Sequence, residues 1–131
     1  MNELLDLPQN KFALISLFIL AIFFILAGLN HFRNAGFYMA IMPPYLPAHK
    51  ELVIISGVFE ILGGVGLLVP ATRQWAGYGL ILLLIAVFPA NLHMALNADA
   101  FAKFGPRWAL YLRLPLQFLL TYWIYWVISQ R

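Results

Sequence analysis

Four long apolar runs dominate this chain and constrain its fold more than any motif does. They are Phe12 to Leu29, Leu52 to Val69, Trp75 to about Met94, and Trp108 to Ile128. Each is close to the ~20 residues that an α-helix needs to cross a bilayer. Only 10% of the 131 residues are charged, against roughly 25% in ordinary soluble domains. The pattern predicts a single all-α domain over residues 1–131, a polytopic four-transmembrane-helix bundle in a bacterial-type inner or plasma membrane.

Composition also excludes several classes of function. The chain has no cysteine, so disulfides, thiolate metal sites and dithiol redox chemistry are ruled out. The net charge is +3, but the basic residues are scattered singly, which argues against nucleic-acid binding. The histidines and carboxylates lack the spacing of a zinc site, so no metal ligands are assigned. A redox role would need a bound cofactor or a quinone.

Four spans predict that both chain ends lie on one side of the membrane. The basic residues on the two sides number three and four, a bias too small to set the orientation. On the side of the termini they are Lys11, Arg73 and Arg131, and on the other side Arg33, Lys50, Lys103 and Arg107.

Glu60 lies near the middle of an otherwise apolar or glycine run. Because hydrocarbon offers no water, a carboxyl group at that depth must be protonated, paired or facing a polar cavity. Gly57, Glu60 and Gly64 share one helix face, where small residues let another helix approach closely. Glu60 is therefore expected to face protein and to mark a functional site.

Polar residues of the other helices are expected in the same half of the membrane. Arg113 lies roughly 8 Å and Gln117 roughly 14 Å into the last helix, and Arg113 is the predicted counter-charge for Glu60. Asn91 and His93 are separated by about 200° around their helix, so at most one is expected to face a pocket. The candidate ligand-binding residues are Asn30, His31, Tyr45, Glu60, Asn91, His93, Arg113 and Gln117.

Prolines mark the surroundings of this polar region. Pro89 and Pro115 cannot donate to the carbonyls four residues earlier, so both helices can kink beside the pocket. The segment after Arg33, AGFYMAIMPPYLPAHK, predicts a short interfacial helix followed by an extended proline-rich stretch around Tyr45. Two interpretations of this loop stand side by side, a lid over the pocket and an aromatic anchor at the membrane surface.

The polar residues themselves allow two interpretations. Intramembrane polar groups often only join helices, at about 0.6 kcal/mol per hydrogen bond on average, and a Glu60–Arg113 pair can be purely architectural. A histidine at a helix end is likewise more often interfacial than functional. The number of polar groups exceeds what one ion pair needs, and this excess favours a pocket.

Five strings spread over nearly the whole chain resemble the DoxX-like membrane proteins. They are GLNHF at Gly28 to Phe32, MPPYLP at Met42 to Pro47, SGVFEILGGVGLLVP at Ser56 to Pro70, VFPANLHM at Val87 to Met94, and LRLPLQ at Leu112 to Gln117. The resemblance implies a compact four-helix bundle. The family takes its name from a membrane subunit linked to a quinol oxidase or thiosulfate:quinone oxidoreductase in archaea, and it supplies no catalytic residues to carry over.

These observations predict a pocket for a lipophilic small molecule, with a quinone as the leading candidate. Gln117, Asn91 and His31 are suited to donate to quinone carbonyls, and Glu60 to relay protons. An accessory or subunit role in a membrane redox system is favoured over a free-standing enzyme, so a redox partner protein or further copies of the chain are expected partners. The alternatives are a membrane chaperone or assembly factor, and a small transporter that uses the Glu60 carboxylate.

Overall fold

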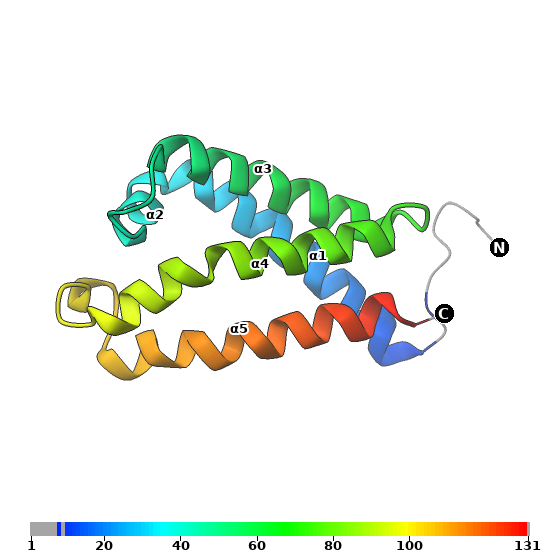
Figure 1. The fold of residues 1–131 in the computed structure, drawn as a ribbon. Coiled ribbons are helices and arrows are strands. Elements are labelled where there is room, and N and C mark those ends of the chain that lie inside the picture. The colour runs from blue at the N-terminus through cyan, green and yellow to red at the C-terminus, as the bar shows by residue number, and fades with distance from the viewer. Residues whose placement is uncertain (1–7, 9, 131) are drawn as a thin grey trace.

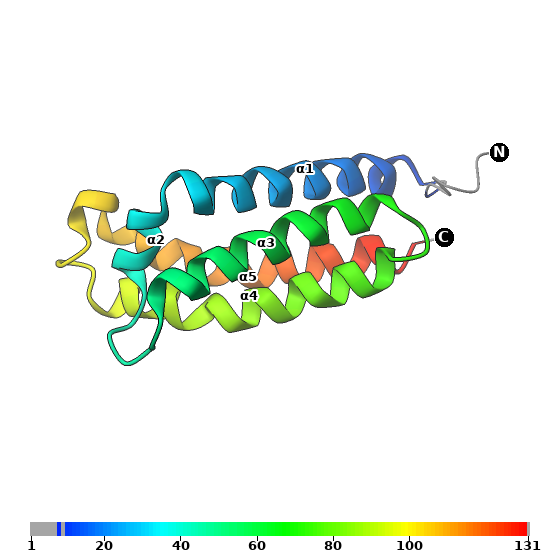
Figure 2. The same cartoon turned by 90° about the horizontal axis from the view of Figure 1, so that it is seen from above.

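In the computed structural model, which describes residues 8 and 10–130, the described chain is entirely helical or irregular. The elements are α1 (Lys11–Arg33), α2 (Ala35–Ile41), α3 (His49–Leu68), α4 (Arg73–Leu96), the 3-10 helix η2 (Ala102–Phe104) and α5 (Arg107–Ile128). The four predicted apolar runs lie in α1, α3, α4 and α5. These long helices pack side by side, and the short α2 lies at one end of the bundle (Figures 1 and 2).

The two ends of the bundle differ in content. The closed end holds the start of α1, the turn between α3 and α4, and the end of α5 (Figure 1). The cavity end holds α2 and the loops over residues 42–48 and 97–106. Because α1 begins and α5 ends at the closed end, the described chain is consistent with termini on one side, although residues 1 and 131 themselves lie outside the described part.

Three of the helices, α1, α3 and α4, are long and apolar enough to cross a membrane. Their outward faces carry large apolar side chains such as Phe12, Leu62 and Leu82, each more than half exposed. Such a surface is compatible with a membrane protein, because lipid tails take the place of water around it. The α5 helix has 22 residues, but it carries Arg113 and Gln117, and its role as a fourth span stays a prediction.

Glycines let the helices approach one another closely. A Cβ atom on Gly64 would lie 2.7 Å from the carbonyl oxygen of Ala21 on α1, and one on Gly28 would lie 2.6 Å from that of Gly57 on α3. The small-residue face predicted for Gly57 and Gly64 therefore packs against α1. Two further glycines allow close contact between the other helices. Gly63 of α3 leaves room for the side chain of Leu80 on α4, and Gly77 of α4 leaves room for that of Ile128 on α5.

The closed end is sealed by an apolar core and by two polar contacts. Its buried residues are Leu17, Leu20, Ala21, Phe24, Leu67, Leu80, Leu84, Ile124, Val127 and Ile128. Trp123 of α5 donates its indole N–H to Ser16 Oγ of α1 at 2.9 Å. Arg73, the first residue of α4, is buried and donates from Nε to the Leu67 carbonyl oxygen at 2.7 Å. This bond satisfies a carbonyl at the end of α3 that has no partner in its own helix.

The loop after α2 is compact rather than extended. Pro43 is buried, and its carbonyl oxygen accepts the Leu46 backbone N–H at 3.1 Å and lies 3.2 Å from His49 Nε2. Ala48 adopts a left-handed conformation with φ of 53° directly before α3, a turn that costs a non-glycine residue free energy. The helices α4 and α5 continue unbroken through Pro89 and Pro115.

Candidate ligand-binding cavity

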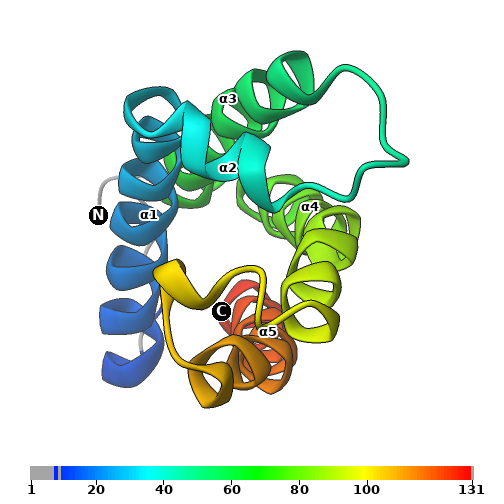
Figure 3. The same ribbon diagram turned by 90° about the vertical axis from the view of Figure 1, so that its left-hand side faces the viewer.

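A cavity of about 530 Å³ lies at the cavity end, and every α-helix contributes to its lining. Most of the lining side chains are apolar, including Phe24, Val53 and Leu84. The volume falls within the range of roughly 300–1,000 Å³ that small-molecule sites occupy. Viewed from this end, the four long helices surround a central space, with α2 on the α3 side and the 97–106 loop on the α5 side (Figure 3).

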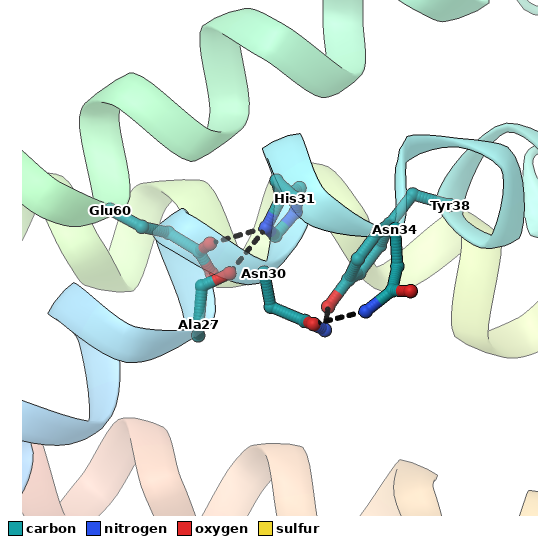
Figure 4. A network of polar contacts seen from close by, with 6 residues as sticks. All are labelled: Ala27, Asn30, His31, Asn34, Tyr38 and Glu60. Carbon is teal, nitrogen blue, oxygen red and sulfur yellow. Dashed lines mark hydrogen bonds and ion pairs between the residues drawn. The ribbon is translucent and has the colours of Figure 1, made fainter.

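One wall carries a histidine and a carboxylate. His31 Nδ1 on α1 lies 2.9 Å from Glu60 Oε2 on α3 and also 2.9 Å from the Ala27 carbonyl oxygen (Figure 4). A single ring N–H cannot serve both acceptors well. Among the described residues, Glu60 Oε2 is buried and accepts no hydrogen bond of good geometry. The carboxylate therefore retains an acceptor site that the described chain does not fill.

Further contacts hold this wall in place. The His31 ring stacks on Tyr38 of α2, with ring centroids 3.9 Å apart and planes 12° from parallel. The Tyr38 hydroxyl accepts from Asn30 Nδ2 at 2.8 Å, and Asn34 Nδ2 donates to Asn30 Oδ1 (Figure 4). The stacking and the amide contacts connect α2 to the last turns of α1, so they fix the ring that faces Glu60.

The opposite wall carries a chain of donors and acceptors that joins α4 and α5. Arg113 Nε donates to Asn91 Oδ1 at 3.1 Å, and Asn91 Nδ2 donates to Gln117 Oε1 at 2.6 Å. Gln117 Nε2 then donates to the Leu84 carbonyl oxygen at 2.6 Å. Both amides are thus occupied by protein partners. The terminal guanidinium nitrogens of Arg113 have no hydrogen-bond or ion-pair partner among the described residues.

The predicted direct pairing of Glu60 with Arg113 is wrong. Glu60 shares its helix face with Gly57 and Gly64, and that face packs on α1, so the carboxylate meets His31 instead. Arg113 lies on α5 across the cavity and binds Asn91. The two charged groups line one cavity, but each belongs to a separate hydrogen-bonded cluster.

Five of the eight predicted site residues line the cavity, namely His31, Glu60, Asn91, Arg113 and Gln117. The other three lie elsewhere. Tyr45 is 74% exposed on the loop surface, and Asn30 supports Tyr38 from outside the cavity lining. His93 contacts Asn97 and the edge of Phe101. Of the two residues on α4, only Asn91 reaches the cavity, in agreement with their angular separation.

Two polar residues of the cavity lining, Tyr38 and Ser56, are not predicted by the sequence. Ser56 precedes Glu60 by four residues on α3, so helical spacing alone places it on the same face. Tyr38 reaches the cavity because α2 folds back over His31, and no local signal in the sequence gives that direction. In the described part of the chain no three His, Asp or Glu side chains come together as metal ligands.

The two walls offer complementary chemistry to a bound molecule. The Glu60 carboxylate accepts hydrogen bonds, and the adjacent imidazole of His31 can gain or lose a proton. The guanidinium of Arg113 donates hydrogen bonds and carries a fixed positive charge. A ligand with an apolar body and polar atoms at both ends would match this arrangement.

The chain also matches a known family. A family model described as "Domain of unknown function (DUF8561)" matches residues 20–128, which include every residue that lines the cavity. Comparisons with curated proteins and with solved structures give no match.

Proposed function

This chain belongs to the DUF8561 family, and we propose that it is a multi-pass membrane protein that binds a lipophilic small molecule in the cavity between its helices. The leading candidate for the ligand is a quinone or a molecule with a quinone-like ring. The protein would then serve as an accessory or subunit of a membrane redox system in a bacterial-type inner membrane.

One observation carries the proposal: the cavity walls hold polar groups that the described chain leaves unsatisfied. The Glu60 carboxylate retains a free acceptor on one wall, and Arg113 retains free donors on the other. Groups that only join helices would bind one another, as Asn91 and Gln117 do. Because an unpaired buried acceptor is costly, a ligand or ordered water is expected at Glu60, and the exposed guanidinium of Arg113 has donors left to bind the same ligand.

A quinone suits this division of roles. Its two ring oxygens lie at opposite ends of an apolar ring, so one can accept from Arg113. The other can accept from His31 as a quinone carbonyl and can donate to the Glu60 carboxylate as the hydroxyl of the reduced quinol. The carboxylate and imidazole there are positioned to exchange protons with a ring oxygen. Asn91 and Gln117 act in support, since both are committed to holding Arg113.

Further predictions belong to the same proposal. We propose that α5 is a fourth span, because it has 22 residues and packs along α4. Reporter fusions at residues 3 and 131 are then expected to report the same compartment, and opposite compartments would contradict four spans. The lid role of the 42–48 loop is proposed because Met42 and Leu46 line the cavity. The resemblance to DoxX-like proteins stays a prediction.

The deciding experiment is mass spectrometry of the lipophilic extract from gently purified protein. We expect a quinone to be enriched in the wild type relative to an unrelated membrane protein from the same cells. In Arg113→Gln and Glu60→Gln variants this enrichment should fall at least tenfold, because each variant weakens one polar wall. Tyr45→Ala is the matched control, since Tyr45 lies on the loop surface away from the cavity lining.

Retention of equal amounts by wild type and both cavity variants would contradict the assignment of the site. Extracts that contain only bulk lipid, together with no binding of added quinone, would contradict the proposed function. Circular dichroism on each variant checks that helix content is unchanged, so that a loss of ligand reports the site rather than the fold.

A further inference from the structure

A groove on the surface of α1 adjoins the cavity. The groove is lined by Phe23, Leu26, Ala27, Leu29, Asn30, Arg33 and Tyr38. Phe23, Ala27 and Tyr38 also line the cavity. These shared residues form the boundary between the two spaces.

Among the neighbouring long helices, the packing is loosest between α1 and α5. At three of the four contacts between neighbouring long helices, a glycine lets the two helices pack closely. These glycines are Gly64 between α3 and α1, Gly63 between α3 and α4, and Gly77 between α4 and α5. No glycine joins α1 to α5, and these two helices contact each other far less than the other neighbouring pairs do. Their described hydrogen bond, from Trp123 to Ser16, lies at the closed end.

Side chains at this opening face both the cavity and the outside. Phe23 of α1 is 49% exposed and Leu116 of α5 is 50% exposed, although both line the cavity. Phe23 precedes the end of α1 by ten residues, which is about 15 Å of helix. The opening therefore lies at a depth where lipid tails, not water, surround a spanning helix.

We propose that the cavity exchanges its ligand directly with the bilayer through a side opening between α1 and α5, and that the ligand is an amphiphile with a hydrocarbon tail. Its polar head lies between Glu60 and Arg113, and its tail leaves past Phe23 and Leu116. This inference rests on the proposed function. The physical basis is that the buried Glu60 Oε2 faces the cavity without a good hydrogen-bond donor, whereas the apolar Phe23 of α1 and Leu116 of α5 line the cavity and are about half exposed.

A tail-dependent binding measurement tests this placement. The probes are 2,3-dimethoxy-5-methyl-1,4-benzoquinone without a side chain and the same ring with a decyl chain, added to protein in nanodiscs. Ala27→Phe narrows the junction between cavity and groove, so the decyl compound should lose at least tenfold in affinity, whereas the ring alone should change less than threefold. Gly79→Phe is the control, because its Cβ position has open space around it on α4.

A second measurement does not depend on a ligand. The chain lacks cysteine, so a single bimane label can be placed at Ala27→Cys, at Leu62→Cys on the outer face of α3, or at Ser56→Cys on the α3 wall of the cavity. Nitroxide groups on lipid tails should quench the label at position 27 about as strongly as at position 62, and at least threefold more than at position 56.

The outcomes separate the two proposals. Weak quenching at position 27, equal to that at position 56, would overturn the side opening even if both quinones bind. Equal loss of both compounds in Ala27→Phe would overturn the placement of the tail. If neither compound binds the wild type, the proposed function fails and the tail placement fails with it, whereas the quenching result still decides whether the bundle opens to lipid.

Discussion

The closed end and the cavity end are built from the same four long helices, yet they pack in opposite ways. Glycines bring α1 and α3 into close contact at both ends, but only at the closed end does a buried apolar cluster fill the centre. At the cavity end the centre is hollow, and α2 and the loops hold the helices from the outside. A smaller buried cluster of Met94, Ala98, Phe101 and Leu110 anchors the 97–106 loop there.

This difference indicates where stability and binding are located. Close packing gains dispersion energy at every contact, so the filled core of the closed end stabilises the bundle. The cavity end can then keep polar groups without protein partners, as Glu60 and Arg113 show. Substitutions at the closed end should therefore lower the stability of the fold, and substitutions at the cavity end should mainly change what the protein binds.

The largest expected effect is at the contact between α1 and α3. Gly64→Leu would drive its side chain into the backbone of Ala21 and Ile25, so we expect a loss of about 3 kcal/mol in the free energy of unfolding. Gly79→Ala is the matched control, because its Cβ meets open space, and it should stabilise α4 by up to about 1 kcal/mol. Thermal unfolding in mild detergent measures both. Equal melting temperatures for Gly64→Leu and wild type would contradict close packing at the closed end.

The second effect concerns the buried arginine that caps α3. Arg73→Met keeps much of the side-chain volume but removes the donor to the Leu67 carbonyl, and a buried carbonyl without a partner costs about 1–3 kcal/mol. Arg107→Met is the control, because Arg107 and its partner Asp99 are exposed. Chemical denaturation should show a clear loss for the first variant and almost none for the second. Similar losses would mean that Arg73 acts only through surface charge.

A smaller effect is expected where the cavity wall is tied together. Gln117→Leu leaves the Asn91 amide without its 2.6 Å acceptor and should cost about 1–2 kcal/mol. Adding Asn91→Leu should cost less than the sum of the two single changes, because both remove the same bond. His93→Leu, on the same helix but outside the cavity lining, is the control. Strict additivity of the two cavity variants would show that the amides do not act as a pair.

The smallest effect distinguishes the observed charge pairing from the predicted one. A double-mutant cycle of His31→Phe with Glu60→Gln should give a coupling energy of about 1 kcal/mol, since the two side chains are in contact. The cycle of Glu60→Gln with Arg113→Gln should be additive within about 0.5 kcal/mol, because the groups face each other only across the cavity. Stronger coupling for the second cycle would restore the ion pair that the sequence predicted.

Predictions from the sequence succeeded where periodicity alone carries the information. The face shared by Gly57, Glu60 and Gly64 follows from residues three and four apart, and the structure uses it as a close helix contact. The choice between Asn91 and His93 followed from their angle around α4. Periodicity gives the face of a helix but not the neighbour that covers it, and for this reason Glu60 was paired with the wrong partner.

Other features depended on contacts between segments far apart in the chain. Tyr45 was favoured because three prolines surround it, yet the compact turn around buried Pro43 leaves it on the surface. Arg73 was treated as a loop charge, but the short turn folds it back onto the last carbonyls of α3. The sequence predicts Gln117 and Asn91 as donors to a ligand, but Asn91 donates to Gln117 and Gln117 donates to the Leu84 carbonyl oxygen.

The sequence by itself determined the helices, because apolar length and helical spacing are local properties of the chain. It also determined that ionisable groups would have to be buried within one of the apolar runs. Only the tertiary structure decided that α3 turns its glycine face to α1, that α5 stands apart from α1 beside the cavity, and that the carboxylate and the guanidinium lie on opposite walls. Those outcomes depend on which helix surfaces fit together, and that fit is set by side chains that the sequence places many residues apart.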